Sequence, residues 1–160
     1  MKYIGILLVL AAAVFVSRDY TNYINKRSVE CKDFLAFIAH MRIQVGCFLR
    51  PVKMLGEGFT SSALEKAGFI SALSDSDCIL DAYKKCEPNL SLSAEEKALL
   101  DNFFSSFGEG YLDDGLKLIE SSYSGMERLY KNLCEEKAKN LKLVTALAVT
   151  FALGIIIFVI

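Results

Sequence analysis

The stretch "LDDGLKLIESSYSGMERLYKNL" (residues 112–133) carries apolar side chains at alternating steps of four and three residues. This spacing is typical of a helix that packs lengthwise along a partner helix. It therefore predicts a long helix with one buried face, whose stripe consists of Leu112, Leu116, Ile119, Tyr123, Met126, Tyr130 and Leu133.

Residues 20–48 carry a second stripe of similar length, in which Arg27 fills the one position without an apolar side chain. Pro51 follows it and disfavours helix at the preceding residue. We therefore predict that Tyr20–Phe48 pairs antiparallel with Leu112–Leu133. The stripe consists of Tyr20, Ile24, Cys31, Phe34, Ile38, Met41, Val45 and Phe48, and the predicted core contains Phe34, Ile38, Met41, Ile119, Tyr123 and Met126.

Shorter helices are expected between the two long ones. "SAEE" (93–96) is a capping box with Ser93 at the N-cap and Glu96 at the third helical position, and that helix should end at Gly108. "SDSDCILDAYKKC" (74–86) predicts another short helix, and no segment shows a strand pattern. The predicted fold class is an all-α bundle of two long and two or three short helices between two transmembrane helices.

Both ends of the chain are apolar. Leu143–Ile160 contains no charge, and as a helix it would be about 27 Å long, close to the thickness of a hydrocarbon core. Tyr3–Val16 is shorter and has the length of a signal-peptide core, but a cut after Ser17 would place Phe15 where a small residue is required. We expect an anchor at 1–17, a helical domain at 18–142 and an anchor at 143–160, with cleavage of the first segment as the alternative.

Positive charge beside a span marks its cytoplasmic side. Lys137, Lys139 and Lys142 precede the last apolar stretch, whereas the first stretch has basic residues on both sides. The domain is therefore expected to face the cytoplasm, held at the inner face of a membrane by both ends, with both chain termini outside.

Charge is unevenly distributed along the helical domain. The formal charge is +3 over residues 18–66, −7 over 75–120 and +2 over 121–142. Basic residues are favourable near anionic lipid. The acidic middle is then a candidate docking surface for a basic partner, with a solvated helical face as the alternative.

The sequence offers little for chemistry. Five cysteines form no C-x-x-C pair, and His40 is the only histidine. Neither Glu95–Glu96 nor Asp113–Asp114 converges on one atom, because neighbours on a helix point about 100° apart. A net charge of −1 and a pI near 5.9 do not favour nucleic-acid binding. We expect no enzyme activity, cofactor, metal site or small-molecule substrate, and reduced cysteines packed in the core.

The layout resembles the stage III sporulation protein AB family of endospore-forming Firmicutes. That family has an E-I-x-Y-G-x-T-P-L stretch, which aligns with residues 44–52 and retains Pro51 and the aliphatic Val45. Its F-G-x-x-L-G motif is loosely matched by 103–108, and its K-N-x-K is present at 139–142. The polar residues of its D-x-x-x-Q step are absent, because Tyr111 and Gly115 stand there.

The resemblance implies a component of the eight-protein stage III sporulation complex, which helps form a channel between mother cell and forespore. The family's helical domain is similar to that of the platform protein of type II secretion and type IV pilus machines, which sits beside a hexameric ATPase. It implies a scaffold in the outer forespore membrane that contacts other complex members, including the neighbouring ATPase, and that could form homo-oligomers. The candidate partner-binding residues are Gly108, Gly110, Tyr111, Asp113 and Asp114. The alternative is a two-span ligand sensor or a membrane adaptor unrelated to secretion.

Overall fold

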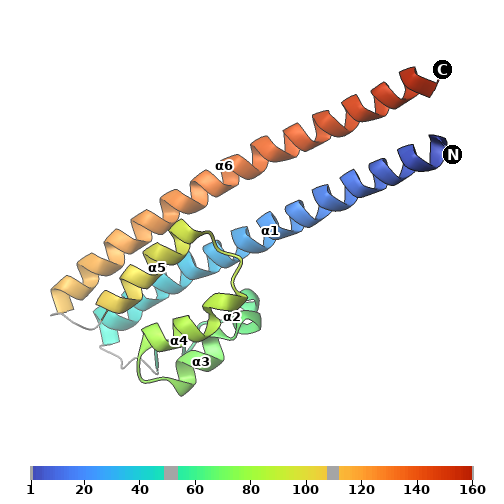
Figure 1. Cartoon of the computed structure of the whole chain (residues 1–160). Coiled ribbons are helices and arrows are strands. Elements are labelled where there is room, and N and C mark those ends of the chain that lie inside the picture. The colour runs from blue at the N-terminus through green and yellow to red at the C-terminus, as the bar shows by residue number, and fades with distance from the viewer. Residues whose placement is uncertain (1, 49–53, 108–111, 160) are drawn as a thin grey trace. The chain divides into compact units, whose positions relative to one another are not determined.

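The structure, a computed structural model, describes the backbone of residues 2–48, 54–107 and 112–159. Side chains are described for 17–44, 54–107, 115–140 and eight residues near the ends (11, 15, 143, 144, 146, 147, 150 and 154). All regular structure in these residues is helical: α1 (Lys2–Phe48), α2 (Ser62–Ala67), α3 (Phe69–Asp75), α4 (Ile79–Cys86), the 3₁₀ turn η2 (Glu87–Asn89), α5 (Ala94–Ser106) and α6 (Leu112–Val159) (Figure 1). The all-α prediction is confirmed.

The prediction of two or three short helices was too low, because the described chain has four. The additional pair is α2 and α3, which meet at Gly68. Ser61 caps α2 by accepting a hydrogen bond from the Leu64 N–H at 3.1 Å. Gly68 then has a φ of 86°, the left-handed conformation that glycine adopts readily. Helices of six and seven residues are too short to show a clear 3.6-residue period in sequence.

The predicted capping box of α5 is confirmed. The Ser93 side chain accepts from the Glu96 N–H, and the Glu96 carboxylate accepts from the Ser93 N–H at 2.7 Å. The helix ends at Ser106, and the predicted stop at Gly108 lies outside the described residues. The predicted break at Pro51 lies outside them as well.

The chain divides into two compact units. One contains Arg27–Lys131, which we call the helical unit, and the other contains Met1–Lys26 together with Asn132–Ile160, which we call the end unit. Both long helices contribute to both units. Each unit is described below by itself.

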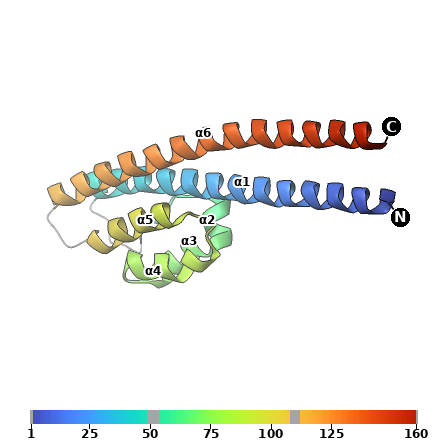
Figure 2. The ribbon, with the colours of Figure 1, turned by 45° about the horizontal axis from the view of Figure 1, so that its top comes forward.

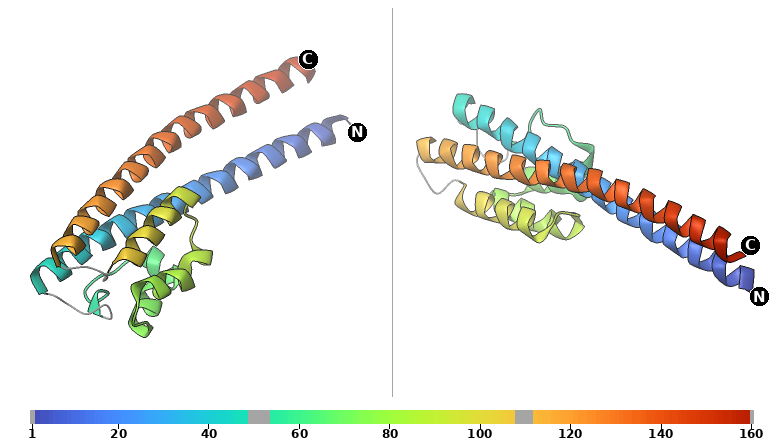
Figure 3. Two further views of the ribbon diagram at one scale, coloured as in Figure 1. Left: turned by 60° about the vertical axis from the view of Figure 1, so that its left-hand side comes forward. Right: turned by 90° about the horizontal axis from the view of Figure 1, so that it is seen from above.

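In the helical unit, α1 and α6 run antiparallel (Figures 2 and 3). The Cys31 and Met126 sulfur atoms lie 4.0 Å apart, and further along Arg42 pairs with Glu120. Five of the six predicted core residues are fully buried, namely Phe34, Ile38, Met41, Ile119 and Met126. Tyr123 is only half-buried, because it lines an open groove, so its prediction was wrong. The side chains of Val45 and Phe48 lie outside the described residues.

An aromatic cluster joins α1 to the short helices. The Phe34 ring centroid lies 5.4 Å from that of Phe69 on α3 and 6.1 Å from that of Tyr83 on α4. Phe104 of α5 completes the cluster, 5.1 Å from Tyr83. Phe37, which lies beside the predicted stripe, is also fully buried and contacts Phe69. Helix α1 therefore buries a wider face than the stripe alone predicts.

A polar row on α1 fixes the ends of the short helices. Arg27 binds the Glu96 carboxylate of the α5 capping box, with Nε–Oε2 and Nη2–Oε1 distances of 2.9 Å. Buried Glu30 accepts from the Ser91 N–H at 2.6 Å, and Asp33 accepts from the Ser61 hydroxyl at 2.6 Å. The spacing of three residues places these side chains on one side of α1. The row therefore holds the N-caps of α2 and α5 against α1.

The four cysteines with described side chains are reduced thiols, but only two of them belong to the core. Cys31 and Cys86 are buried, whereas Cys78 is exposed and Cys134 is half-buried. The expectation that the cysteines pack in the core was therefore wrong for Cys78. The Cys47 side chain lies outside the described residues.

In the end unit, the two chain ends lie at the same end of the α1 and α6 segments (Figures 1 and 2). The Asn140 amide donates to the Tyr20 hydroxyl at 2.8 Å and so joins the two segments. Among the residues that the structure describes, no helix combines the length and the apolar character needed to cross a membrane.

Candidate interaction site

The predicted partner-binding residues lie largely outside the described part of the chain. Gly108, Gly110 and Tyr111 fall within 108–111, which the structure does not describe. Asp113 and Asp114 belong to the first turn of α6, but their side chains are not described. The prediction of this site therefore stays a prediction.

The acidic middle segment is partly neutralised inside the helical unit. The Glu96 side chain is fully buried against Arg27, and Lys84 pairs with both Glu87 at 3.0 Å and Asp101 at 2.6 Å. Glu120 pairs with Arg42. The formal charge of −7 therefore overstates the negative charge that this segment offers to a partner.

Exposed carboxylates remain around the connection between α3 and α4. Asp75, Asp77 and Asp81 are exposed and border an open hollow of about 560 Å³. Lys84 and Lys85 line the same hollow, and the Lys85 ammonium donates to the Ser76 hydroxyl at 3.1 Å. The surface is thus mixed in charge and does not form a uniform acidic patch.

A second feature is an open groove between α1 and α6 in the helical unit, which we call the α1–α6 groove. It has a volume of about 830 Å³ and a mostly apolar lining: Ala39, Arg42, Ile43, Leu116, Ile119, Glu120, Tyr123 and Ser124. Ile43 is 57% exposed, which is high for a large aliphatic side chain. The Arg42 and Glu120 side chains form an exposed ion pair at 2.7 Å.

The α1–α6 groove was not predicted from the sequence. Leu116 and Tyr123 belong to the stripe of α6, which predicts burial, whereas Ile43 lies outside the stripe of α1. Together they leave an apolar hollow one turn beyond Asp113. An open groove between two antiparallel helices is suited to receive the apolar ridge of a further helix.

Two side chains that could in principle act as nucleophiles are deeply buried. Burial raises the pKa of the Cys86 thiol to about 12, and the thiol donates to the Tyr83 carbonyl at 3.1 Å. Burial, followed by the Asp101 charge, raises the pKa of the Tyr83 hydroxyl well above its usual range. Both groups are neutral at physiological pH and lie in the aromatic core. His40 is half-buried, and its ring lies tilted against that of Phe59 with the centroids 5.5 Å apart.

The sequence model of stage III sporulation protein AB matches residues 2–160. The chain belongs to this family. Stage III sporulation protein AB is a family of sporulation proteins, so the resemblance predicted from the sequence is confirmed. No curated protein and no solved structure gives a significant match.

Proposed function

We propose that this protein is a non-enzymatic, membrane-anchored scaffold of the stage III sporulation complex that docks a cytoplasmic ATPase. One observation carries the proposal. The two apolar ends of the chain fall in one unit, whereas the residues between Arg27 and Lys131 form a second unit with its own buried core. This division suits a domain held at one side of a bilayer by two anchors.

The anchors themselves are proposed from the sequence, namely from the uncharged stretch 143–160 and the shorter apolar stretch 3–16. Lys137, Lys139 and Lys142 favour a cytoplasmic helical unit. In a sporulating cell this corresponds to the mother-cell side of the outer forespore membrane.

Docking of the partner is proposed at the α1–α6 groove and the first turn of α6. The groove offers exposed Ile43 and half-buried Tyr123 as apolar contacts. Asp113 and Asp114 supply negative charge one turn before the groove-lining Leu116, which favours a partner with basic residues beside an apolar ridge.

Binding of the ATPase to the full-length chain in neutral detergent tests the docking. Ile43→Ser should weaken binding about five- to tenfold, because it removes an aliphatic contact that docking would bury. Val29→Ser is the matched control, since Val29 is 48% exposed on the same helix and does not line the groove. Asp113→Lys together with Asp114→Lys should weaken binding most at low salt. Equal affinities for both serine variants would count against docking in the groove.

The exposed native thiol of Cys78 reports the side of the membrane. When the chain is produced in the plasma membrane of non-sporulating cells, a membrane-impermeant maleimide should not label Cys78 in intact cells and should label it after permeabilisation. Labelling in intact cells would place the helical unit outside and would favour the sensor alternative. In both states the buried Cys31 and Cys86 are internal controls for folding.

A further inference from the structure

The end unit contains a small cleft between α1 and α6, which we call the collar cleft. It is lined by Tyr20, Thr21, Ile24, Asn25, Lys137, Asn140 and Val144. The Tyr20 hydroxyl accepts a hydrogen bond from the Asn140 side-chain amide at 2.8 Å, which links the two walls of the cleft. Ile24 is buried, so the cleft has an apolar side and a polar side.

The polar side of the collar cleft is rich in hydrogen-bond donors. Lys137 contributes an ammonium group, and Asn25 contributes a side-chain amide. The Asn140 amide has a second hydrogen besides the one given to Tyr20, and the Tyr20 hydroxyl still has its own. The Thr21 hydroxyl is used within α1, where it donates to the Ser17 carbonyl at 2.8 Å. Such a lining suits an oxygen atom that carries negative charge.

The size of the collar cleft limits what enters it. Its volume of about 20 Å³ is enough for roughly one oxygen atom, since a single water needs about 10–15 Å³ by the same measure. A phosphate group would therefore place one oxygen in the cleft and leave its other substituents outside.

The position of the collar cleft in the chain indicates where that phosphate comes from. Val144 belongs to the uncharged stretch 143–160, and Tyr20 follows the apolar stretch 3–16 by about one turn. In the proposed membrane arrangement these residues lie at headgroup depth, where tyrosine and lysine are the usual interfacial side chains. Exposed Arg18 and Lys139 are balanced by exposed Asp19, Glu135 and Glu136, so the charge that lines the cleft itself is that of Lys137.

We infer that the collar cleft binds one phosphate oxygen of an anionic glycerophospholipid, which holds α1 and α6 together at the membrane surface. The inference rests on the membrane anchoring in the proposed function. An anionic lipid is favoured over a zwitterionic one because the quaternary ammonium of phosphatidylcholine would oppose the charge of Lys137.

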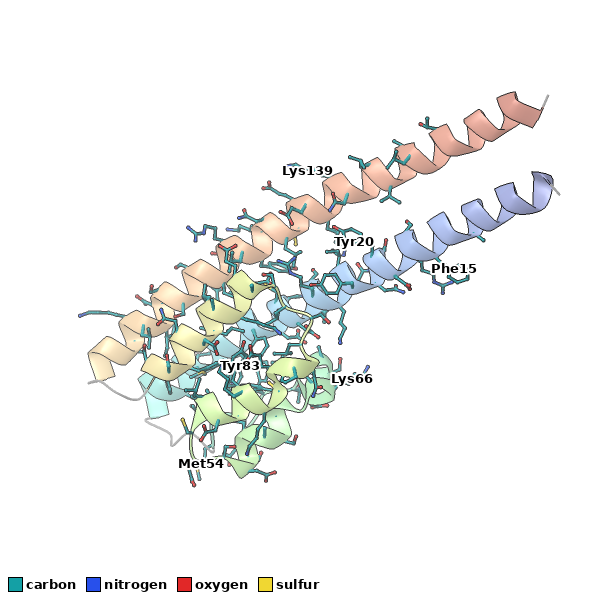
Figure 4. All side chains as sticks on the ribbon, viewed as in Figure 1. Phe15, Tyr20, Met54, Lys66, Tyr83 and Lys139 are labelled. Atoms are coloured by element: carbon teal, nitrogen blue, oxygen red, sulfur yellow. The ribbon has the colours of Figure 1, made fainter. Side chains whose placement is uncertain are left out.

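The test uses the full-length chain in neutral detergent, titrated with phosphatidylglycerol or phosphatidylcholine, with bound lipid measured by native mass spectrometry. The wild type should bind phosphatidylglycerol about fivefold more tightly, and Lys137→Gln should remove that preference. Lys137→Arg should restore it. Lys139→Gln is the matched control, because Lys139 is exposed and extends from α6 on the side away from α1 (Figure 4). Tyr20→Phe should weaken binding of the anionic lipid through loss of the hydroxyl.

Three outcomes would overturn the inference. They are equal binding of both lipids, equal losses for Lys137→Gln and Lys139→Gln, or full competition by glycerol 3-phosphate, which would identify a soluble anion as the ligand. Alkaline carbonate extraction of cell membranes separates the two proposals. If the chain resists extraction but shows no lipid preference, the membrane anchoring stands and only the lipid-binding inference is wrong. If carbonate releases the chain, both the membrane anchoring and the lipid-binding inference are wrong.

Discussion

Breaking the buried ion pair between Arg27 and Glu96 should destabilise the helical unit strongly. The Glu96 side chain is fully buried and the Arg27 side chain is 18% exposed. Both the ε- and η-nitrogens of Arg27 reach the carboxylate, which also accepts the Ser93 N–H. The pair therefore joins α1 to the first turn of α5. Removal of Arg27 would leave the Glu96 carboxylate in the interior, where it would still accept the Ser93 N–H.

The size of the destabilisation depends on which partner of the ion pair is left buried. Arg27→Met retains most of the aliphatic stem and strands the carboxylate, so it should cost about 3 kcal/mol, the lower end of the range for a broken buried pair. Glu96→Gln should cost about 2 kcal/mol, because the guanidinium left behind has some access to water. The double variant should cost little more than Arg27→Met alone, which corresponds to a coupling energy of about 2 kcal/mol.

The chain supplies its own matched control. Arg42 and Glu120 also join two helices, at 2.7 Å, but their side chains are 62% and 57% exposed. Exposed pairs are screened by water and salt, so the cycle of Arg42→Met with Glu120→Gln should give a coupling energy of no more than about 0.5 kcal/mol. The comparison holds the residue types constant and changes burial.

Buried thiols provide the assay. Cys31 and Cys86 are almost completely buried in the helical unit, so they become reactive when it unfolds. Pulsed alkylation of the full-length chain in neutral detergent, across a urea series, gives the free energy of unfolding of each variant from the labelled fraction. Exposed Cys78 should label at every urea concentration and so controls for the reagent.

The reasoning would be refuted by a coupling energy for Arg27 and Glu96 that matches that of the exposed pair. It would also fail if Arg27→Met were as stable as the wild type. Either result would mean that Glu96 finds other compensation and that the pair does not hold α5 to α1.

Three further predictions concern the helical unit. Gly68→Ala should cost about 1–2 kcal/mol of stability, because φ is 86° at this position. Gly115→Ala should stabilise the unit by up to about 1 kcal/mol, because Gly115 lies in a helix with open space for a methyl group. The same urea assay measures both variants, and a change of the same sign in both free energies of unfolding would contradict the assigned conformations. Ile119→Ala should cost about 2–5 kcal/mol, since Ile119 is fully buried, and a loss below about 1 kcal/mol would show that the α6 stripe is not core. The raised pKa of Cys86, about 12 in the folded chain against an ordinary 9.0, means that the unfolded chain releases its proton first, so stability should fall as pH rises from about 9 towards 12. Cys86→Ala should reduce the dependence of stability on pH in this range relative to the wild type. An unchanged pH dependence would count against the raised pKa of Cys86.

Much of the fold could be predicted from local patterns. The stripes of residues 20–48 and 112–133 predicted two long antiparallel helices, because a period near 3.5 residues can be buried only along a helix face. The capping box at Ser93 and Glu96 predicted the start of α5, since both of its hydrogen bonds join residues within one turn. Order and spacing along the whole chain were also sufficient to indicate the family.

The sequence by itself thus determined the helix type, the antiparallel pair, most of its core and the acidic character of the middle segment. Only the tertiary structure decided which charged side chains pair with one another inside the helical unit, because Arg27 and Glu96 are 69 positions apart and no local pattern links them. It also decided that Tyr123 lines an open groove and that Tyr20 meets Asn140. The periodicity of a sequence shows which face of a helix is apolar. How much of that face becomes buried depends on how closely the second helix approaches. That distance is set by packing between segments that are far apart in the chain.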